Sequence, residues 1–157
     1  DKETNLAYQI SAEFYLPAQK KEPEIDEKNP LRLSVCYENT ILKTNEETDC
    51  RINLIYDSYG DPGMVMVEAG LPPGFTPIRE SLNALCEQHI AEKYSVTDSH
   101  IILYIAGMAE RRNLEFVLRM KASCPAKVRT APSRAYEYYN PYIFSATEPV
   151  ELEVTEN

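Results

Sequence analysis

The chain has 157 residues, of which 16 are Lys or Arg and 25 are Asp or Glu, so its formal net charge is −9. This length suits one domain with a sizeable core. A surface this acidic is repelled by the phosphates of nucleic acids and by anionic lipid head groups, so neither is an expected partner. No apolar run approaches the about 20 residues that a membrane-spanning helix needs, so membrane insertion is not expected.

The sequence opens on a predicted strand followed by a charged connection. It begins at Asp1 without a basic or apolar leader, which favours a processed protein or a piece of a larger one. Residues 5–16 alternate apolar and polar side chains, the pattern of a half-buried strand. The charged, proline-containing stretch 20–30 is typical of a solvated loop. We therefore divide the chain into a leading strand and linker at 1–30 and a main body at 31–157.

The main body continues with the same period of two. Apolar runs without polar alternation predict central strands that are covered on both faces, and they occur at 64–69 and 100–106. Eleven prolines and only five glycines suit an all-β domain with stiff loops. Half-buried strands are expected at 31–38, 48–56, 113–120 and 150–154.

One segment departs from the β pattern. Ile78, Leu82 and Leu85 follow helical spacing, Thr76 is a candidate N-cap, and Pro77 suits the first helical position. We predict a helix at 77–88 and, after it, a hairpin that turns at 97–99. The sum of about nine strands and one helix predicts an all-β, Ig-like antiparallel β-sandwich with one inserted short α-helix.

The stretch "NALCEQHIAEK" places a thiol beside an imidazole. On a helix, Cys86 and His89 would be neighbours, but both would point outward from one surface, a poor geometry for proton transfer. Cys86 also continues the apolar stripe of the helix, where a buried thiol behaves as a small hydrophobe. An internal thioester would need a glutamine three residues after the cysteine, whereas Gln88 follows by two. These patterns predict a chain that is not an enzyme.

The sequence contains no motif for a metal, phosphate-binding or hydrolase site. The two histidines, His89 and His100, have no carboxylate partner at zinc-like spacing, and no phosphate-binding, hydrolase or metalloprotease motif occurs. No cofactor is therefore expected. In the segment 134–141, Tyr136 and Tyr138 share one strand face, where packing in the sheet is the expected role and ligand stacking is the alternative.

Three stretches in order carry a family resemblance: "MVMVEAGLPPGF", "HIILYIAGMAERRNLEFVLRMKA" and "APSRAYEYYNP". Together they resemble the C-terminal receptor-binding domain, also called the last macroglobulin domain, of the alpha-2-macroglobulin and complement thioester-protein family. The segment 31–54 fits the opening hairpin of that domain. The resemblance covers about residues 31–154, and residues 5–17 look like the segment that leaves the preceding region.

The resemblance implies a non-catalytic β-sandwich domain of a large protease trap that is secreted, extracellular or periplasmic. The thioester of such a trap lies in another domain. The implied partners are neighbouring domains of the larger protein and a cell-surface receptor.

In vertebrate members the helix of this domain carries two lysines, four residues apart, that engage a scavenger receptor. Those lysines fall on Arg79 and Asn83 of this chain. The first position keeps its charge and the second does not, and arginine is not equivalent to lysine where an acidic calcium-bound pocket grips a compact ammonium. A solvated surface role remains the alternative for Arg79.

The secreted setting of the family permits disulfides. The pairings considered are Cys36 with Cys50 and Cys86 with Cys124, and four reduced thiols are the open alternative. A bridge requires facing Cβ atoms about 3.5–4.5 Å apart.

Two rival functions belong to different classes. A free-standing Ig-like adhesion or carbohydrate-binding module would use the tyrosines and would show no large exposed apolar patch, whereas a domain taken from a larger protein should expose one. An enzyme based on Cys86 would need an exposed thiol with a lowered pKa.

Overall fold

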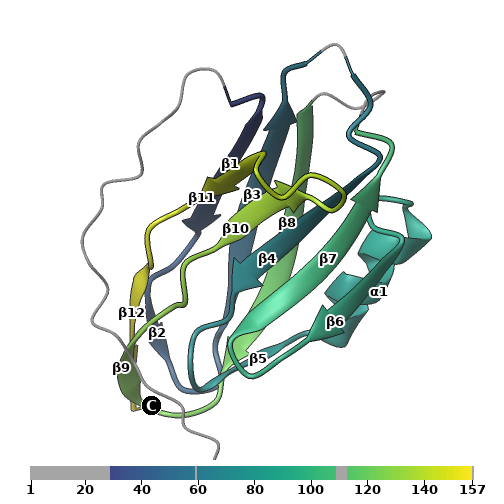
Figure 1. Ribbon diagram of the computed structural model, residues 1–157. Helices are drawn as coiled ribbons and strands as arrows, with labels where there is room; N and C mark the ends of the chain where they lie inside the picture. Colours follow the sequence, from purple (N-terminus) through teal and green to yellow (C-terminus); the bar gives the residue numbers. More distant parts are fainter. Residues whose placement is uncertain (1–28, 59, 109–112, 157) are drawn as a thin grey trace, which may run out of the picture.

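The computed structural model of the protein describes residues 29–58, 60–108 and 113–156. The predicted leading strand at 5–16 lies outside these residues, as does most of the linker. Two antiparallel sheets face one another, and the five-stranded sheet stands in front of the four-stranded sheet in Figure 1. The described part of the chain is thus a β-sandwich with one short helix, as the sequence predicted.

The strands form three sheets whose order is known from backbone pairing. The four-stranded sheet has the order β1 (Leu31–Tyr37), β3 (Glu47–Tyr56), β8 (Asn113–Ala122) and β5 (Phe75–Pro77). The five-stranded sheet has the order β11 (Phe144–Ala146), β10 (Arg134–Glu137), β4 (Met64–Gly70), β7 (His100–Ala106) and β6 (Lys93–Val96). A small third sheet has the order β2 (Ile41–Lys43), β12 (Glu151–Thr155) and β9 (Ala126–Arg129).

Alternation of side chains gives each large sheet one apolar inner face. In β3 every second residue is buried, and the same holds for β7 and β8. These inner residues pack into one core, because transfer of apolar surface from water is the main favourable term in folding. The largest fully buried side chains are Leu31, Ile52, Leu54, Val65, Leu82, Ile101, Leu103, Ile105, Met108, Leu118, Met120 and Leu152.

The predicted strands of the main body are present, with ends that differ by a few residues. Four strands were not predicted: β2, β5, β9 and β11, each of three or four residues. Such short segments contain too few residues to show a period of two. The hairpin between β6 and β7 turns where the sequence placed it, and Thr97 N–H donates to the His100 carbonyl at 2.9 Å.

The prediction of how the helix begins was wrong. Helix α1 spans Arg79–Glu87, its N-cap is Ile78, and no side chain caps it. Thr76 and Pro77 belong to β5 because they pair with β8, and the Thr76 hydroxyl lies 3.2 Å from the Ser123 hydroxyl. Pairing with β8 therefore takes up the two residues that were expected to start the helix.

The end of the helix follows a common C-terminal pattern. Ile90 N–H donates to the Leu85 carbonyl at 2.9 Å, and His89 N–H donates to the Cys86 carbonyl at 3.0 Å. His89 has a φ of 53°, in the left-handed region. This is the Schellman arrangement, in which the residue after the cap turns left-handed and satisfies the last carbonyls of the helix.

Gly70, at the end of β4, is a point of close backbone approach. Its N–H donates to the Ser133 hydroxyl at 2.9 Å, and its carbonyl accepts from the Tyr37 hydroxyl at 3.0 Å. A Cβ at this position would lie 2.0 Å from the carbonyl oxygen of Ala131. The connection between β9 and β10 can therefore cross β4 only where the side chain is a hydrogen atom.

We expect Gly70→Ala to lower the free energy of unfolding by about 2–3 kcal/mol, because backbone rather than a flexible side chain must move. Urea unfolding followed by circular dichroism measures this change. Gly60→Ala is the matched control, since a Cβ there meets nothing within 4 Å. A Gly70→Ala variant as stable as Gly60→Ala would contradict the role assigned to this contact.

Candidate functional site

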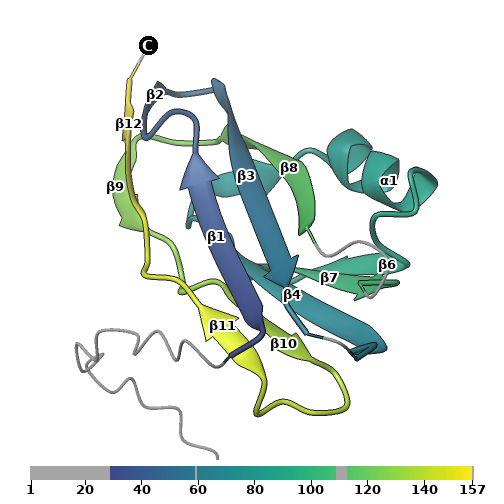
Figure 2. The same cartoon turned by 90° about the horizontal axis from the view of Figure 1, so that it is seen from above.

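Helix α1 carries the chain from the four-stranded sheet to the five-stranded sheet. Leu82 and Leu85 are buried, and they anchor the helix over β8 and β6. In Figure 2 the helix lies at the side of the sandwich, next to β6 and β8. Arg79 and Asn83 are exposed and, four residues apart, share one face of the helix. The two residues that the resemblance singled out therefore lie together on an accessible surface.

The structure gives these two residues different roles. Asn83 Oδ1 accepts a hydrogen bond from the Tyr94 hydroxyl at 2.8 Å, which ties the helix to β6. Among the described residues, the Arg79 side chain makes neither an ion pair nor a hydrogen bond. Arg79 therefore presents a guanidinium that is available to a partner, whereas the amide oxygen of Asn83 is already engaged.

A groove runs along the open side of the sandwich, beside the start of the helix. We call it the seam groove, because it lies between β5 and β6, the last strands of the two large sheets on this side. Its members come from β5, from the helix and from β6. They are Thr76, Pro77, Arg79, Tyr94 and Val96.

Cys86 and His89 do not lie on one regular face of the helix, which is the arrangement that the sequence suggested. Cys86 is half-buried and packs against the core. His89 lies beyond the last helical residue with left-handed backbone, so the two are not neighbours on one regular helical face. Among the described residues, no group of three or more His, Cys, Asp or Glu side chains could hold a metal ion.

All four cysteines are free in the structure, which is the alternative that the sequence left open. The register places Cys36 opposite Arg51 and Cys50 opposite Tyr37, so the first two thiols point to opposite faces of the sheet. Cys36 is exposed and Cys50 is buried. Burial raises the pKa of the Cys50 thiol to about 12, so this thiol stays protonated and unreactive.

The outer face of the five-stranded sheet carries a row of apolar and aromatic side chains. The register sets Phe144 beside Tyr136, Tyr136 beside Met66, and Met66 beside Tyr104. Lys93 of β6 closes the row, with its ammonium 4.2 Å from the centre of the Tyr104 ring. We call these five residues the aromatic row. It crosses all five strands of the sheet.

An ion pair lies beside the aromatic row on the same face. Arg134 Nε donates to Glu68 Oε2 at 2.7 Å, and the Tyr136 hydroxyl donates to Glu68 Oε1 at 3.0 Å. Burial opposes ionisation of Glu68, but the hydrogen bonds from Arg134 and Tyr136 outweigh it and lower the pKa of the carboxyl. The pKa of the Tyr136 hydroxyl is raised, mainly by burial and to a smaller extent by its hydrogen bond to Glu68. The Glu68 carboxylate thus fixes the Tyr136 ring in the row.

The outer face of the four-stranded sheet is different in kind. Arg119 Nε donates to Asp49 Oδ1 at 2.8 Å, and Arg51 Nε lies 3.4 Å from Glu115 Oε1. Three of these four side chains are at least half exposed, and Asp49 is 29% exposed. Ion pairs without a row of aromatic side chains thus distinguish this outer face from that of the five-stranded sheet.

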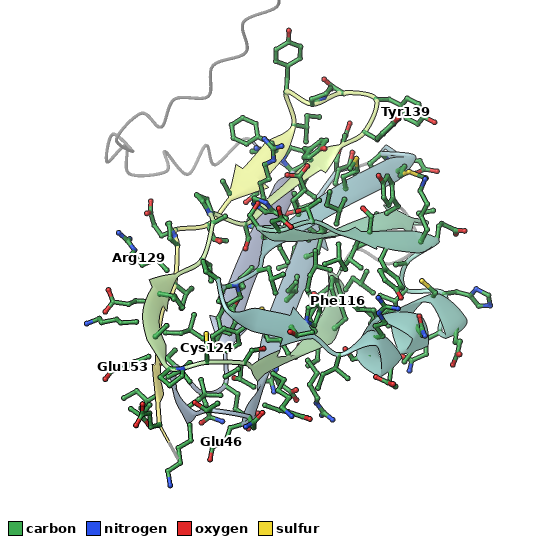
Figure 3. All side chains as sticks on the ribbon, turned by 90° about the horizontal axis from the view of Figure 1, so that it is seen from below. Glu46, Phe116, Cys124, Arg129, Tyr139 and Glu153 are labelled. Carbon is green, nitrogen blue, oxygen red and sulfur yellow. The ribbon has the colours of Figure 1, made fainter. Side chains whose placement is uncertain are left out.

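The hairpin between β10 and β11 extends the aromatic surface. Tyr138, Tyr139 and Tyr142 have exposed fractions of 48%, 79% and 92%. Figure 3 shows Tyr139 at the hairpin end of the sandwich, far from Glu46 at the other end. The rings of Tyr138 and Tyr139 meet edge to face with centroids 5.1 Å apart.

Sequence reasoning paired Tyr136 with Tyr138 but missed the rest of the aromatic row. Met66, Tyr104 and Phe144 lie on three other strands, and only the register brings them beside Tyr136. A signal was present in the two runs at 64–69 and 100–106, which lack a regular polar alternation.

No helix among the described residues has the length and apolar character needed to cross a membrane.

Solved structures with similar folds include bacterial alpha-2-macroglobulins. The native form from Escherichia coli superposes with a TM-score of 0.65 at 13% identity, over 81% of this chain and 9% of that chain. The Salmonella alpha-2-macroglobulin reacted with methylamine gives a TM-score of 0.60 at 17% identity, over 81% of this chain and 9% of that chain. An Escherichia coli fragment from domain MG7 to the C-terminus gives 0.62 at 16% identity, over 80% of this chain and 23% of that chain.

Sequence comparison points in the same direction. Ovostatin from Gallus gallus is 23% identical over 90 residues, which are 57% of this chain and 6% of ovostatin. The chain therefore spans a small part of the relatives that it matches. Residues 60–148, more than half of the chain, match the family described as the A-macroglobulin receptor binding domain. The chain belongs to this receptor-binding-domain family of the alpha-2-macroglobulins.

Proposed function

We propose that this chain is the non-catalytic C-terminal interaction domain of a larger, alpha-2-macroglobulin-like protease-trapping protein. Such a protein would act outside the cell or in the periplasm. Family membership and the small share of each relative that the chain covers support this proposal. A free-standing adhesion or carbohydrate-binding module is not favoured, because the match is to one domain of much longer proteins.

The aromatic row is the observation that supports this proposal most strongly. Strand β7 has the sequence of a strand covered on both faces, yet Ile102 and Tyr104 on its outer face are only half-buried. Tyr136 is also half-buried, and Phe144 is 53% exposed. An apolar sheet face of this extent is expected where a partner normally covers it. We infer that a neighbouring domain of the same polypeptide packs on it.

Helix α1 is the proposed recognition surface for a receptor. Arg79 is exposed and unpaired among the described residues, so it can donate to an acidic partner without first breaking a contact. Asn83 lacks the second charge of the lysine pair, and its hydrogen bond to Tyr94 fixes the orientation of the helix instead. The half-buried thiol of Cys86 supports a non-catalytic role for the same helix.

Hydroxyl-radical footprinting tests the packing face. In the full-length protein that the gene encodes, we expect modification of Tyr104 and Tyr136 to fall at least about three-fold relative to the isolated chain, because a neighbouring domain excludes water from the aromatic row. Peptide mass spectrometry measures the modified fraction at each residue.

Maleimide labelling provides the internal control for that experiment. Cys36 and Cys124 are exposed and lie away from the aromatic row, so both should label equally in the two forms. If Tyr104 and Tyr136 are modified equally in the full-length protein and the isolated chain, no neighbouring domain packs on the aromatic row.

The helix surface is tested by binding to immobilised, calcium-loaded acidic repeats of a scavenger receptor, measured by biolayer interferometry. Arg79→Ala should weaken binding at least about five-fold, since the one unpaired cation of this surface is lost. Asn83→Lys should strengthen binding about three-fold or more by restoring the second charge.

Asn83→Gln is the matched control, because it disturbs the hydrogen bond to Tyr94 without adding a charge. If Arg79→Ala binds as tightly as the unchanged chain, α1 is not the receptor surface.

A further inference from the structure

We propose that β6 accepts an extended segment of a partner protein as an added strand, seated in the seam groove. The inference rests on the proposed function, since it names the form of partner that would meet the surface around Arg79. It concerns the strand beside the helix, however, rather than the helix alone.

Strand β6 lies at the end of its sheet. It ends the five-stranded sheet on the side where α1 crosses between the sheets, so one of its edges has no neighbouring strand among the described residues. An edge strand presents unpaired N–H and C=O groups and is a template for another strand. Added strands are a recurring mode of peptide recognition.

The backbone groups of two β6 residues point toward this edge. Thr97 N–H donates to the His100 carbonyl, so these two residues form a hydrogen-bonded pair. Bonded and non-bonded pairs alternate in an antiparallel ladder, which makes Val96–Ile101 and Tyr94–Leu103 non-bonded pairs. The backbone groups of Tyr94 and Val96 therefore point away from β7, toward the free edge.

Tyr94 and Val96 also line the seam groove. Val96 is 45% exposed, so its apolar side chain is accessible from the groove. Pro77 lies across the groove, and the hydrogen bond from Tyr94 to Asn83 holds the Tyr94 ring in place. Edge-facing hydrogen-bonding groups and an apolar lining thus occur together in a groove that is held in shape.

The groove also carries a positive charge. The Arg79 guanidinium belongs to the groove and is unpaired among the described residues, so it selects for a carboxylate. An extended partner alternates its side chains between two faces. The geometry therefore fits a segment that places small β-branched residues toward Val96 and Pro77 and one acidic residue toward Arg79.

The other strands at the ends of the large sheets are less suited to this role. Ser145 of β11 accepts from Leu33 N–H of β1 at 3.0 Å, and Phe144 O accepts from the Asn29 side chain, so β1 and the segment before it cover β11. Strand β5 has three residues, and Pro77 offers no N–H. Among these ends, β6 combines outward-facing backbone groups with a groove beside them.

The test uses a hexapeptide probe, acetyl-Thr-Val-Glu-Val-Thr-Val-amide, titrated into the ¹⁵N-labelled chain. We expect the largest amide shifts at Tyr94 and Val96 and a dissociation constant below about 1 mM. Replacing the glutamate of the probe with glutamine should weaken binding at least about three-fold, and Arg79→Gln should remove that difference between the probes.

Two variants at one position separate strand addition from simple contact. Val96→Pro removes an N–H that faces the free edge, and it leaves the β6–β7 hydrogen bonds in place. Val96→Ala also loses the isopropyl group of valine, but it keeps that N–H. We expect Val96→Pro to weaken probe binding at least about ten-fold and Val96→Ala about three-fold or less.

The outcomes are decisive in either direction. Equal binding by the two Val96 variants, or largest shifts away from β6, would overturn strand addition. If Val96→Pro fails to fold, a probe with all internal amides N-methylated replaces it, and undiminished binding of that probe has the same meaning. If the probe does not bind but receptor binding still depends on Arg79, strand addition is wrong and the proposed function is unaffected.

Discussion

Burial of the two inner sheet faces against each other is the interaction on which the rest of the structure depends. It uses every second residue of the long strands, so each large sheet keeps a single outer face. Those outer faces need not be alike. Ion pairs such as Arg119–Asp49 lie on one of them, whereas the aromatic row lies on the other, where we propose that a neighbouring domain packs.

The crossing between the sheets produces the second surface. The chain leaves the four-stranded sheet at Pro77 and enters the five-stranded sheet at Lys93, and α1 fills that interval. Leu82 and Leu85 hold the helix on the core, while the bond between Asn83 and Tyr94 ties it to the neighbouring strand. The exposed face of α1, the edge strand β6 and the seam groove are therefore consequences of one connection.

The sequence predicted the long strands from two patterns. Burial follows a period of two in β1, β3, β7, β8 and β12, whereas β4 is an apolar run that is buried on both faces. It could not predict β2, β5, β9 and β11, whose three or four residues carry no period. The start of the helix was misplaced because pairing of Thr76 with Lys121 outweighed the local capping preference. The aromatic row and the contact between Asn83 and Tyr94 depend on register and on the crossing angle of the helix, which local patterns do not encode. Arg79 and Asn83, by contrast, were located by resemblance to a family.

We infer that the outer face of the five-stranded sheet is an interface between domains of one larger protein. A structure of the complete protein that the gene encodes, determined by electron cryomicroscopy, would show whether this is so. We expect another domain to cover Tyr104 and Tyr136, and the outer face of the four-stranded sheet to meet solvent. A structure in which the aromatic row faces solvent, with the charged sheet face buried instead, would contradict it.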